Sequence, residues 1–421
     1  MPALPLLSAT SPEDWRYLAE GGANLVLSYS PSDPSSEPSQ YFGNVLRLRK
    51  RKKGGAALGG EADIEFGESI IQPLLDNVVH VERVAIDRVW LEQLGAVLEA
   101  RKSRPHERRE KDEIDLKSEF GFVAEDLVGG KGVLAFEIKP KWGFLPLATH
   151  LSPSSSSIKT TYCRFCMHRY YRSRSIDEHL EGYCPLDLYS RDEARIRKAV
   201  RALYCIWLES NGEANSFRIF HNGERITPDN AILVHTAMNP HPKDDPPTSA
   251  PNMLDLIADR LVPTLLASPV LPKLANLQSS LDPLDIEGLA NLVSTSLDLD
   301  ISDPTADLTR LGPQPSLEEW KTFLSDYSSS PDTTAERDVR HEILSYLLSA
   351  TFKDCSIIIS YSTDPETNGV ETKVRAIDLD PKPIGKLGKW FELDNEIVEC
   401  WGEMVEGLGE EERANLRKCN G

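Results

Sequence analysis

Apolar residues alternate or run continuously in several segments of the chain, and these segments predict strands. Residues 23–30 and 41–50 are β-rich runs that predict two strands of a small sheet. Residues 132–138, with the sequence GVLAFEI, form a nearly continuous apolar run, which is typical of a strand covered on both faces. Residues 216–227 predict a short hairpin that turns at Asn222-Gly223.

Helical spacing of apolar residues predicts helices between these strands. Residues 89–102 repeat apolar positions at this spacing and end in basic residues, as a helix C-terminus prefers. After a proline-rich linker at 239–252, we expect the chain to be largely helical to about residue 352. Because strands and helices are interspersed, we expect an α+β fold.

The segment 189–210 carries a complete set of helix signals. Ser190 and Glu193 have the spacing of a capping box, and the helix should stop at Asn211-Gly212. The apolar residues at helical spacing, which should face the core, are Ile196, Val200, Leu203 and Trp207.

A second hairpin brings two carboxylates together. Residues 354–362 and 371–380 are β-like runs joined by a turn segment at 363–370. If the two strands pair antiparallel, Asp354 and Asp378 emerge at the same end of the hairpin. Two such carboxylates suit a phosphotransferase, since one can orient the hydroxyl nucleophile while the other holds magnesium against nucleotide phosphates. The alternative is that both acids simply end strands at the surface.

Composition places limits on the class of protein. The chain has 421 residues, of which 40% are hydrophobic and 27% charged, so we expect a globular protein of two lobes or domains. The sequence contains no apolar run long enough for a membrane span and does not begin like a signal peptide. Seven cysteines without a framework favour reduced thiols, hence an intracellular protein of the nucleus or cytoplasm.

Positive charge is clustered although the chain as a whole carries a formal net charge of −19. Basic runs occupy residues 47–53, 101–111, 163–174 and 380–390. They are either solvated faces or parts of one focused pocket for a small polyanion. The overall charge argues against a general nucleic-acid binder, although the run at 47–53 leaves RNA association or a nuclear import signal open.

Eight segments, in order, resemble the inositol-pentakisphosphate 2-kinase family. They are GGANLVLSY, VLRLRK, EIKPKWGFLP, CRFCMH, YCPLDLYS, LQSSLDPLDIEG, KDCSIIIS and DLDPKP. The third and fourth segments are the most specific, and the resemblance extends from Gly21 to beyond Lys386. It implies a two-lobed inositol phosphate kinase fold, distantly like protein kinases, with an N-lobe at 1–128 and a C-lobe at 129–421. A helical insertion would occupy about 253–352 of the C-lobe.

The family resemblance implies an ATP-dependent kinase. It would transfer the γ-phosphate of ATP to the 2-hydroxyl of inositol 1,3,4,5,6-pentakisphosphate and form inositol hexakisphosphate (phytate), with Mg²⁺ as cofactor. A kinase for a lower inositol phosphate, or for a protein side chain, and a non-catalytic scaffold that binds inositol polyphosphates remain alternatives. We expect a monomer that binds neither membrane nor nucleic acid.

The resemblance also assigns roles to individual residues. Asp354 is expected to activate the 2-hydroxyl, and Asp378 to bind magnesium. The residues expected at the ATP site are Gly21, Gly22, Asn24, Arg47, Glu137 and Arg218. The residues expected to contact the inositol phosphate are Arg104, Arg108, Lys139, Lys141, His168, Arg172, Asn215, Arg218, Lys382, Lys386 and Trp390.

Several of these residues have a purely structural alternative. His168 could be a packed histidine, Arg218 a cross-strand partner, and Trp390 a core aromatic. Arg104 and Arg108 could lie on a solvated loop.

A structural zinc is not expected from the sequence. Plant members of the family bind zinc in the helical region, where this chain has no Cys-x-x-Cys pair. The segment CRFC, with His168 and Cys184, offers suitable ligand types but lacks a clean second pair.

Overall fold

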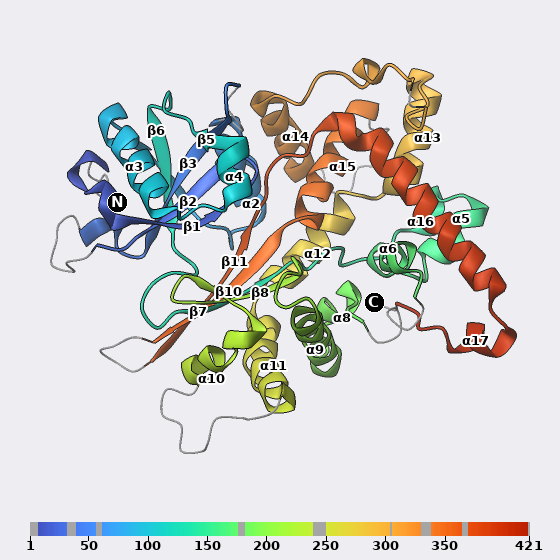
Figure 1. Ribbon diagram of the computed structural model, residues 1–421. Coiled ribbons are helices and arrows are strands. Elements are labelled where there is room, and N and C mark those ends of the chain that lie inside the picture. The colour runs from blue at the N-terminus through green and yellow to red at the C-terminus, as the bar shows by residue number, and fades with distance from the viewer. Residues whose placement is uncertain are drawn as a thin grey trace.

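Two antiparallel sheets organise the chain, with helices around them (Figure 1). The computed structural model describes residues 7–31, 39–55, 61–175, 182–238, 250–303, 305–329, 338–363 and 369–419. Most of the predicted linker at 239–252, and the middle of the predicted turn at 363–370, lie outside these ranges. No helix among the described residues is long and apolar enough to cross a membrane.

The first sheet is built from the N-terminal part of the chain. Its strands are β1 (Trp15–Glu20), β2 (Asn24–Tyr29), β3 (Asn44–Lys52), β4 (Val81–Ala85), β5 (Asp112–Ile114) and β6 (Phe120–Glu125). They are ordered β1-β2-β3-β6-β4, with β5 paired to β3. The predicted strands at 23–30 and 41–50 are thus confirmed as β2 and β3, whereas β1 was not predicted.

One hydrophobic core lies between the first sheet and helix α3 (Arg88–Arg101). Trp15, Leu27 and Leu46 from the sheet pack with Trp90 and Leu94 of the helix. The helix begins where the Asp87 side chain accepts hydrogen bonds from two backbone N–H groups, and it ends at Lys102. The predicted helix at 89–102 is therefore confirmed.

The second sheet occupies the centre of the molecule (Figure 1). Its strands are β7 (Leu134–Ile138), β8 (Phe217–His221), β9 (Glu224–Ile226), β10 (Ser356–Thr363) and β11 (Val370–Ile377). They are ordered β11-β10-β7-β8-β9. All five residues of β7 are buried, as the continuous apolar run predicted. The hairpin β8–β9 turns at Asn222-Gly223, where both residues have positive φ.

Several of the remaining helices pack against the second sheet. Among the described residues, the α-helices other than α3 are α1 (Glu61–Phe66), α2 (Gln72–Leu74), α4 (His106–Lys111), α5 (Pro153–Lys159), α6 (Arg164–Ser173), α8 (Pro185–Leu188), α9 (Glu193–Glu209), α10 (Ile232–Met238), α11 (Ala250–Ala267), α12 (Val270–Ser280), α13 (Asp285–Leu297), α14 (Leu317–Ser329), α15 (Val339–Lys353), α16 (Leu387–Gly407) and α17 (Glu410–Asn415). The largest core joins this sheet to α9, α11, α12 and α15. The region predicted to be helical up to about residue 352 is confirmed in its described part by α11 to α15.

Helix α9 has the predicted buried face, but its N-cap residue differs from the predicted one. Its four predicted core residues are all buried, and the chain leaves the helix at Asn211-Gly212. The capping residue, however, is Asp192, whose side chain accepts a hydrogen bond from the N–H of Arg195. The predicted Ser190 and Glu193 capping box is wrong, because the aspartate two residues later takes that role.

Candidate active site

The two predicted carboxylates meet at one end of the β10–β11 hairpin. Ser356 pairs with Ile377 at the start of β10 and the end of β11. Asp354 precedes that pair, and Asp378 follows it directly. The hairpin geometry predicted from the sequence is therefore confirmed.

The two lysines of the Lys-Pro-Lys segment contact these two carboxylates, one each. Strand β7 pairs antiparallel with β10, so the segment leaves β7 at the hairpin end that carries both acids. The Nζ atom of Lys139 lies 3.3 Å from Oδ2 of Asp378, and Nζ of Lys141 lies 3.6 Å from Oδ1 of Asp354. Lys382 adds a second cation to Asp354, at 3.0 Å.

These lysine contacts keep the Asp354 carboxylate in its charged form. Burial raises the pKa of Asp354, but the cations Lys382 and Lys141 outweigh it and hold the pKa below its ordinary value. Asp354 is therefore ionised at neutral pH. In turn, burial lowers the pKa of Lys141, and Asp354 opposes that shift.

Two backbone positions in the site adopt a left-handed conformation that side chains rarely tolerate. Lys141 has φ 63° and Asp378 has φ 60°. The conformation at Lys141 is supported by Gln278, whose side-chain amide donates to the Lys141 carbonyl (3.0 Å) and to the Phe352 carbonyl (2.9 Å). Buried Gln278 thus joins the lysine segment to the end of α15, just before Asp354. The sequence contained this residue in the segment LQSSLDPLDIEG but gave no reason to single it out.

A cavity of about 450 Å³, which we call the anion pocket, opens beside Asp354. The predicted substrate residues that line it are Lys141, His168, Arg172, Asn215, Lys382, Lys386 and Trp390. They come from the β7 exit, helix α6, the loop before β8, and the region from the end of β11 into α16. Cations from three separate parts of the sequence, together with the neutral Asn215 from a fourth, therefore converge on one cavity.

Two further cations line the anion pocket and were missed from the sequence. Arg164 contacts Asp394 (Nε to Oδ1, 2.6 Å), and Lys353 contacts Asp282; both carboxylates are buried. The Lys353 ammonium also lies 4.2 Å from the centre of the Trp142 ring, a cation–π contact. These carboxylates fix the positions of the two cations and offset part of their charge.

The imidazole of His168 is surrounded by cations, and we predict that this shifts its titration. Burial, and then Arg164, Arg172 and Lys141, lower its pKa to about 4. The free protein should therefore show half-protonation of His168 near pH 4 in an NMR titration of the imidazole carbon-bound protons, assigned with His168→Asn. Because the folded pKa lies below the unfolded value, the unfolded chain binds more protons between about pH 4 and 6.5, and stability rises with pH in that window.

A bound polyanion should reverse this shift, because it neutralises the neighbouring cations. We expect inorganic phosphate or an inositol phosphate to move the His168 midpoint upward, and Arg172→Gln to move it upward in the free protein. A midpoint at pH 6 or above in the free wild type would contradict the predicted environment.

A second cavity lies between the two sheets, and Asp378 is one of its lining residues. Asn24 and Arg47 line it from β2 and β3, and Asp378 and Asp380 line it from the end of β11. Apolar walls come from Ile71, Val79, Val81 and Phe122, which sequence reasoning could not separate from core positions. We call this cavity the inter-sheet pocket. Of the predicted ATP residues, Gly21 and Gly22 form the turn between β1 and β2 and do not line it.

Glu137 and Arg218 are connected to the Asp354 and Asp378 region through Ser356 and Lys139. They are cross-strand neighbours on β7 and β8, with Nη1 of Arg218 3.2 Å from Oε2 of Glu137. The Ser356 hydroxyl donates to Glu137 (2.9 Å), and the Lys139 ammonium donates to the Ser356 hydroxyl (2.8 Å). Buried Glu137 is thus connected to Lys139, and lines neither pocket. Arg218 also lines neither pocket, and its contact with Glu137 is the one that the cross-strand alternative describes.

The structure places Arg104 and Arg108 apart from the other predicted substrate residues. Arg104 is buried under the first sheet, where its guanidinium contacts Glu20 (2.7 Å) and Asp112. Its Nη1 and Nη2 groups donate to Asp112 and Glu20 within the fold, and its contact with substrate stays a prediction. Arg108 is exposed on the short helix α4, and it does not line the anion pocket.

The basic run at 47–53 is exposed only at its end, at Lys52 and Lys53. It forms β3, in which Lys50 is fully buried and contacts Glu20 and Asp112 at 3.0 and 3.1 Å. Arg49 and Arg51 contact Asp115 and Glu113. These ion pairs offset the positive charge that the RNA and import alternatives require.

Comparison with known proteins identifies relatives of this chain. The family model described as inositol-pentakisphosphate 2-kinase matches residues 17–396. An inositol-pentakisphosphate 2-kinase of Cryptococcus neoformans var. neoformans serotype D is 34% identical over 415 residues, covering 94% of each chain. Proteins with the same name from Arabidopsis thaliana and Danio rerio are 27% and 25% identical, covering 94% and 92% of this chain and 95% and 93% of their own.

Proposed function

The chain belongs to the inositol-pentakisphosphate 2-kinase family, and we propose that it transfers the γ-phosphate of ATP to the 2-hydroxyl of inositol 1,3,4,5,6-pentakisphosphate. The product would be inositol hexakisphosphate. The two sheets, with their separate cores, would form the N-lobe (1–128) and C-lobe (129–421) of a distantly protein-kinase-like fold.

One observation carries this proposal: the two carboxylates at one end of the β10–β11 hairpin line different pockets. Asp378 faces the inter-sheet pocket, and Asp354 faces the anion pocket. Lys139 and Lys141 lie beside this pair, with one lysine on each acid. A nucleotide in one pocket and a polyanion in the other would bring a terminal phosphate and an acceptor hydroxyl to the same boundary, as phosphoryl transfer requires.

The anion pocket suits a highly phosphorylated acceptor. Among the residues that the structure describes, six lysine and arginine side chains line it, against the single carboxylate of Asp354. A peptide hydroxyl would not need such a density of cations, whereas a ring bearing five phosphates would use it. Lysines act as point charges on phosphate oxygens, and arginines can bind two oxygens at once.

Asp354 would accept a hydrogen bond from the 2-hydroxyl and orient it toward the γ-phosphate. Its carboxylate is ionised, because two lysines hold its pKa low. When substrate phosphates draw Lys141 and Lys382 toward themselves, Asp354 loses part of that stabilisation. It would then accept the hydroxyl proton more readily as the new bond forms.

Asp378, with Asp380 beside it in the inter-sheet pocket, fits a magnesium site. Both offer carboxylate oxygens, the ligands that Mg²⁺ prefers. Bound magnesium would neutralise charge on the nucleotide phosphates. Arg47 would contact those phosphates from β3, and Lys139 would hold Asp378 in place from the other side.

The proposal is tested by transfer from labelled ATP with magnesium, with products resolved by anion-exchange chromatography. The acceptors are the pentakisphosphate that lacks only the 2-phosphate, an isomer that already carries it, and a tetrakisphosphate. We expect label in hexakisphosphate from the first acceptor and little from the second. Faster transfer to the tetrakisphosphate would favour a kinase for lower inositol phosphates. Tight calorimetric binding without any transfer would favour a scaffold.

A further inference from the structure

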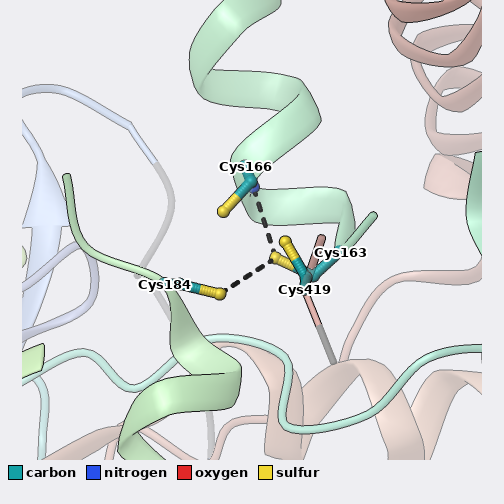
Figure 2. Close-up of side chains that lie close together, drawn as sticks. All are labelled: Cys163, Cys166, Cys184 and Cys419. Atoms are coloured by element: carbon teal, nitrogen blue, oxygen red, sulfur yellow. Dashed lines mark hydrogen bonds between the residues drawn. The ribbon is translucent and has the colours of Figure 1, made fainter. Parts of the chain in front are cut away.

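Four buried cysteines converge outside the two pockets. Cys163 and Cys166 lie at the start of α6, Cys184 immediately precedes α8, and Cys419 follows α17. Each is at most 2% exposed. Figure 2 shows their side chains directed toward one another, and all four sulfur atoms lie within 4.8 Å of each other.

The spacing of the sulfur atoms matches a metal centre and not a disulfide. A zinc ion binds thiolate at about 2.3 Å in tetrahedral geometry, which separates neighbouring sulfurs by about 3.8 Å. The sulfurs of Cys163 and Cys184 are 3.8 Å apart. A disulfide requires about 2.05 Å. The four sulfurs would therefore surround one small cation with little rearrangement.

The surroundings of the cluster also suit thiolates. Cys163 and Cys166 have the Cys-x-x-Cys spacing common in zinc sites, and the backbone N–H of Cys166 donates to the Cys163 sulfur at 3.5 Å. Arg417 approaches from the same segment as Cys419, and its guanidinium donates to the Gly182 carbonyl at 3.1 Å. This guanidinium also contacts the Asp187 carboxylate, so it offsets only a small part of the negative charge that four thiolates would bring to a divalent ion.

We propose that Cys163, Cys166, Cys184 and Cys419 bind one structural Zn²⁺. Four sulfur ligands in tetrahedral arrangement select zinc or iron, and zinc is the usual ion in closed sites that serve only the fold. This revises the sequence-based expectation, which lacked a second ligand pair. Cys184 and Cys419 supply that pair, and His168 is not a member because it lines the anion pocket.

The metal would join three segments that are distant in the sequence. It would fix the start of α6, whose residues Arg164, His168 and Arg172 line the anion pocket. It would also hold the segment after α17, where Leu416 already packs with Trp401. The site itself is independent of the proposed function, whereas its effect on inositol phosphate binding rests on that function.

The first test is metal content. The full chain, expressed with zinc in the medium and purified without chelators, should contain one zinc per chain by plasma mass spectrometry. Cys419→Ser should lose most of this zinc. Cys205→Ser, which changes an exposed cysteine outside the cluster, should keep it. Stoichiometric zinc that persists in Cys419→Ser would overturn the proposed ligand set.

Measurements on the wild type keep the proposal testable if Cys419→Ser does not fold. Cobalt exchanged for the zinc should give the visible absorption bands and the thiolate charge-transfer band of a tetrahedral four-sulfur site. A mercurial, which itself binds the cysteine sulfurs, should release one zinc per chain as the four cysteines are modified, and a metallochromic dye should detect that zinc. Wild-type protein with no bound metal, with iron in place of zinc, or with a disulfide in its non-reduced peptide map would each overturn the proposal.

Discussion

Asp354→Asn should reduce turnover by about 10²–10⁴-fold, the range typical of losing a positioned acid–base group, while nucleotide affinity stays close to that of the wild type. The substitution preserves shape but removes the charge that orients the acceptor hydroxyl. It also leaves the ammonium groups of Lys141 and Lys382 without their carboxylate. Nucleotide binding should persist because Asp354 does not line the inter-sheet pocket.

Single-turnover transfer and calorimetric titration with a non-hydrolysable ATP analogue together measure these two effects. Asp378→Asn is the informative comparison, because it should raise the magnesium concentration needed for activity, whereas Asp354→Asn should not. Asp326→Asn, an exposed acid on α14, should behave as wild type. Turnover above half the wild-type value in Asp354→Asn would remove this residue from the mechanism.

The parts of the site that were predictable from the sequence depend on local strand geometry. Antiparallel pairing of two β-like runs is enough to bring Asp354 and Asp378 to one hairpin end, and the structure has that register. The Lys-Pro-Lys segment follows a strand buried on both faces, so its position at a strand end was also predictable. The convergence of His168, Arg172 and Lys382 on one cavity agrees with the residues that the family resemblance indicated.

The parts that were not predictable depend on contacts between residues far apart in the sequence. Periodicity carries no information that Lys353 would meet Asp282, or that Cys419 would reach Cys163 and Cys166. The contacts of Arg104 were not predictable for a related reason. A basic motif gives the charge of a side chain but not its neighbours, and Glu20 and Asp112 occupy the donors of this arginine.

The largest expected effect on stability comes from a lysine with no part in the chemistry. Lys159 at the end of α5 is 3% exposed, and its ammonium lies 2.8 Å from Asp394 on α16 and also contacts Asp285 on α13. Lys159→Met would leave these two buried carboxylates close together without their shared cation. We expect the free energy of unfolding to fall by about 3–5 kcal/mol, as when one partner of a buried ion pair is removed.

Denaturant unfolding at several pH values distinguishes loss of the Lys159 charge from a simple loss of packing. Burial raises the pKa of Asp285 to about 6, so this acid favours the folded state most when it is protonated, and that contribution is lost as the pH rises through 6. Without Lys159 its pKa should rise further, and the destabilisation of Lys159→Met should shrink as the pH falls from 8 to 5. Asp285→Asn in the same chain should recover part of the loss.

The matched control is Lys198→Met, which replaces an exposed lysine on α9 and should change stability little. A pH-independent loss in Lys159→Met would mean that its alkyl chain, not its charge, stabilises the junction of α5, α13 and α16. Asp394 also contacts Arg164 of the anion pocket. If the charge of Lys159 is what stabilises the junction, its removal should therefore also affect Arg164, whereas loss of alkyl packing alone should not. Removal of Lys159 should strengthen the hold of Asp394 on Arg164 and thereby weaken binding of the inositol phosphate.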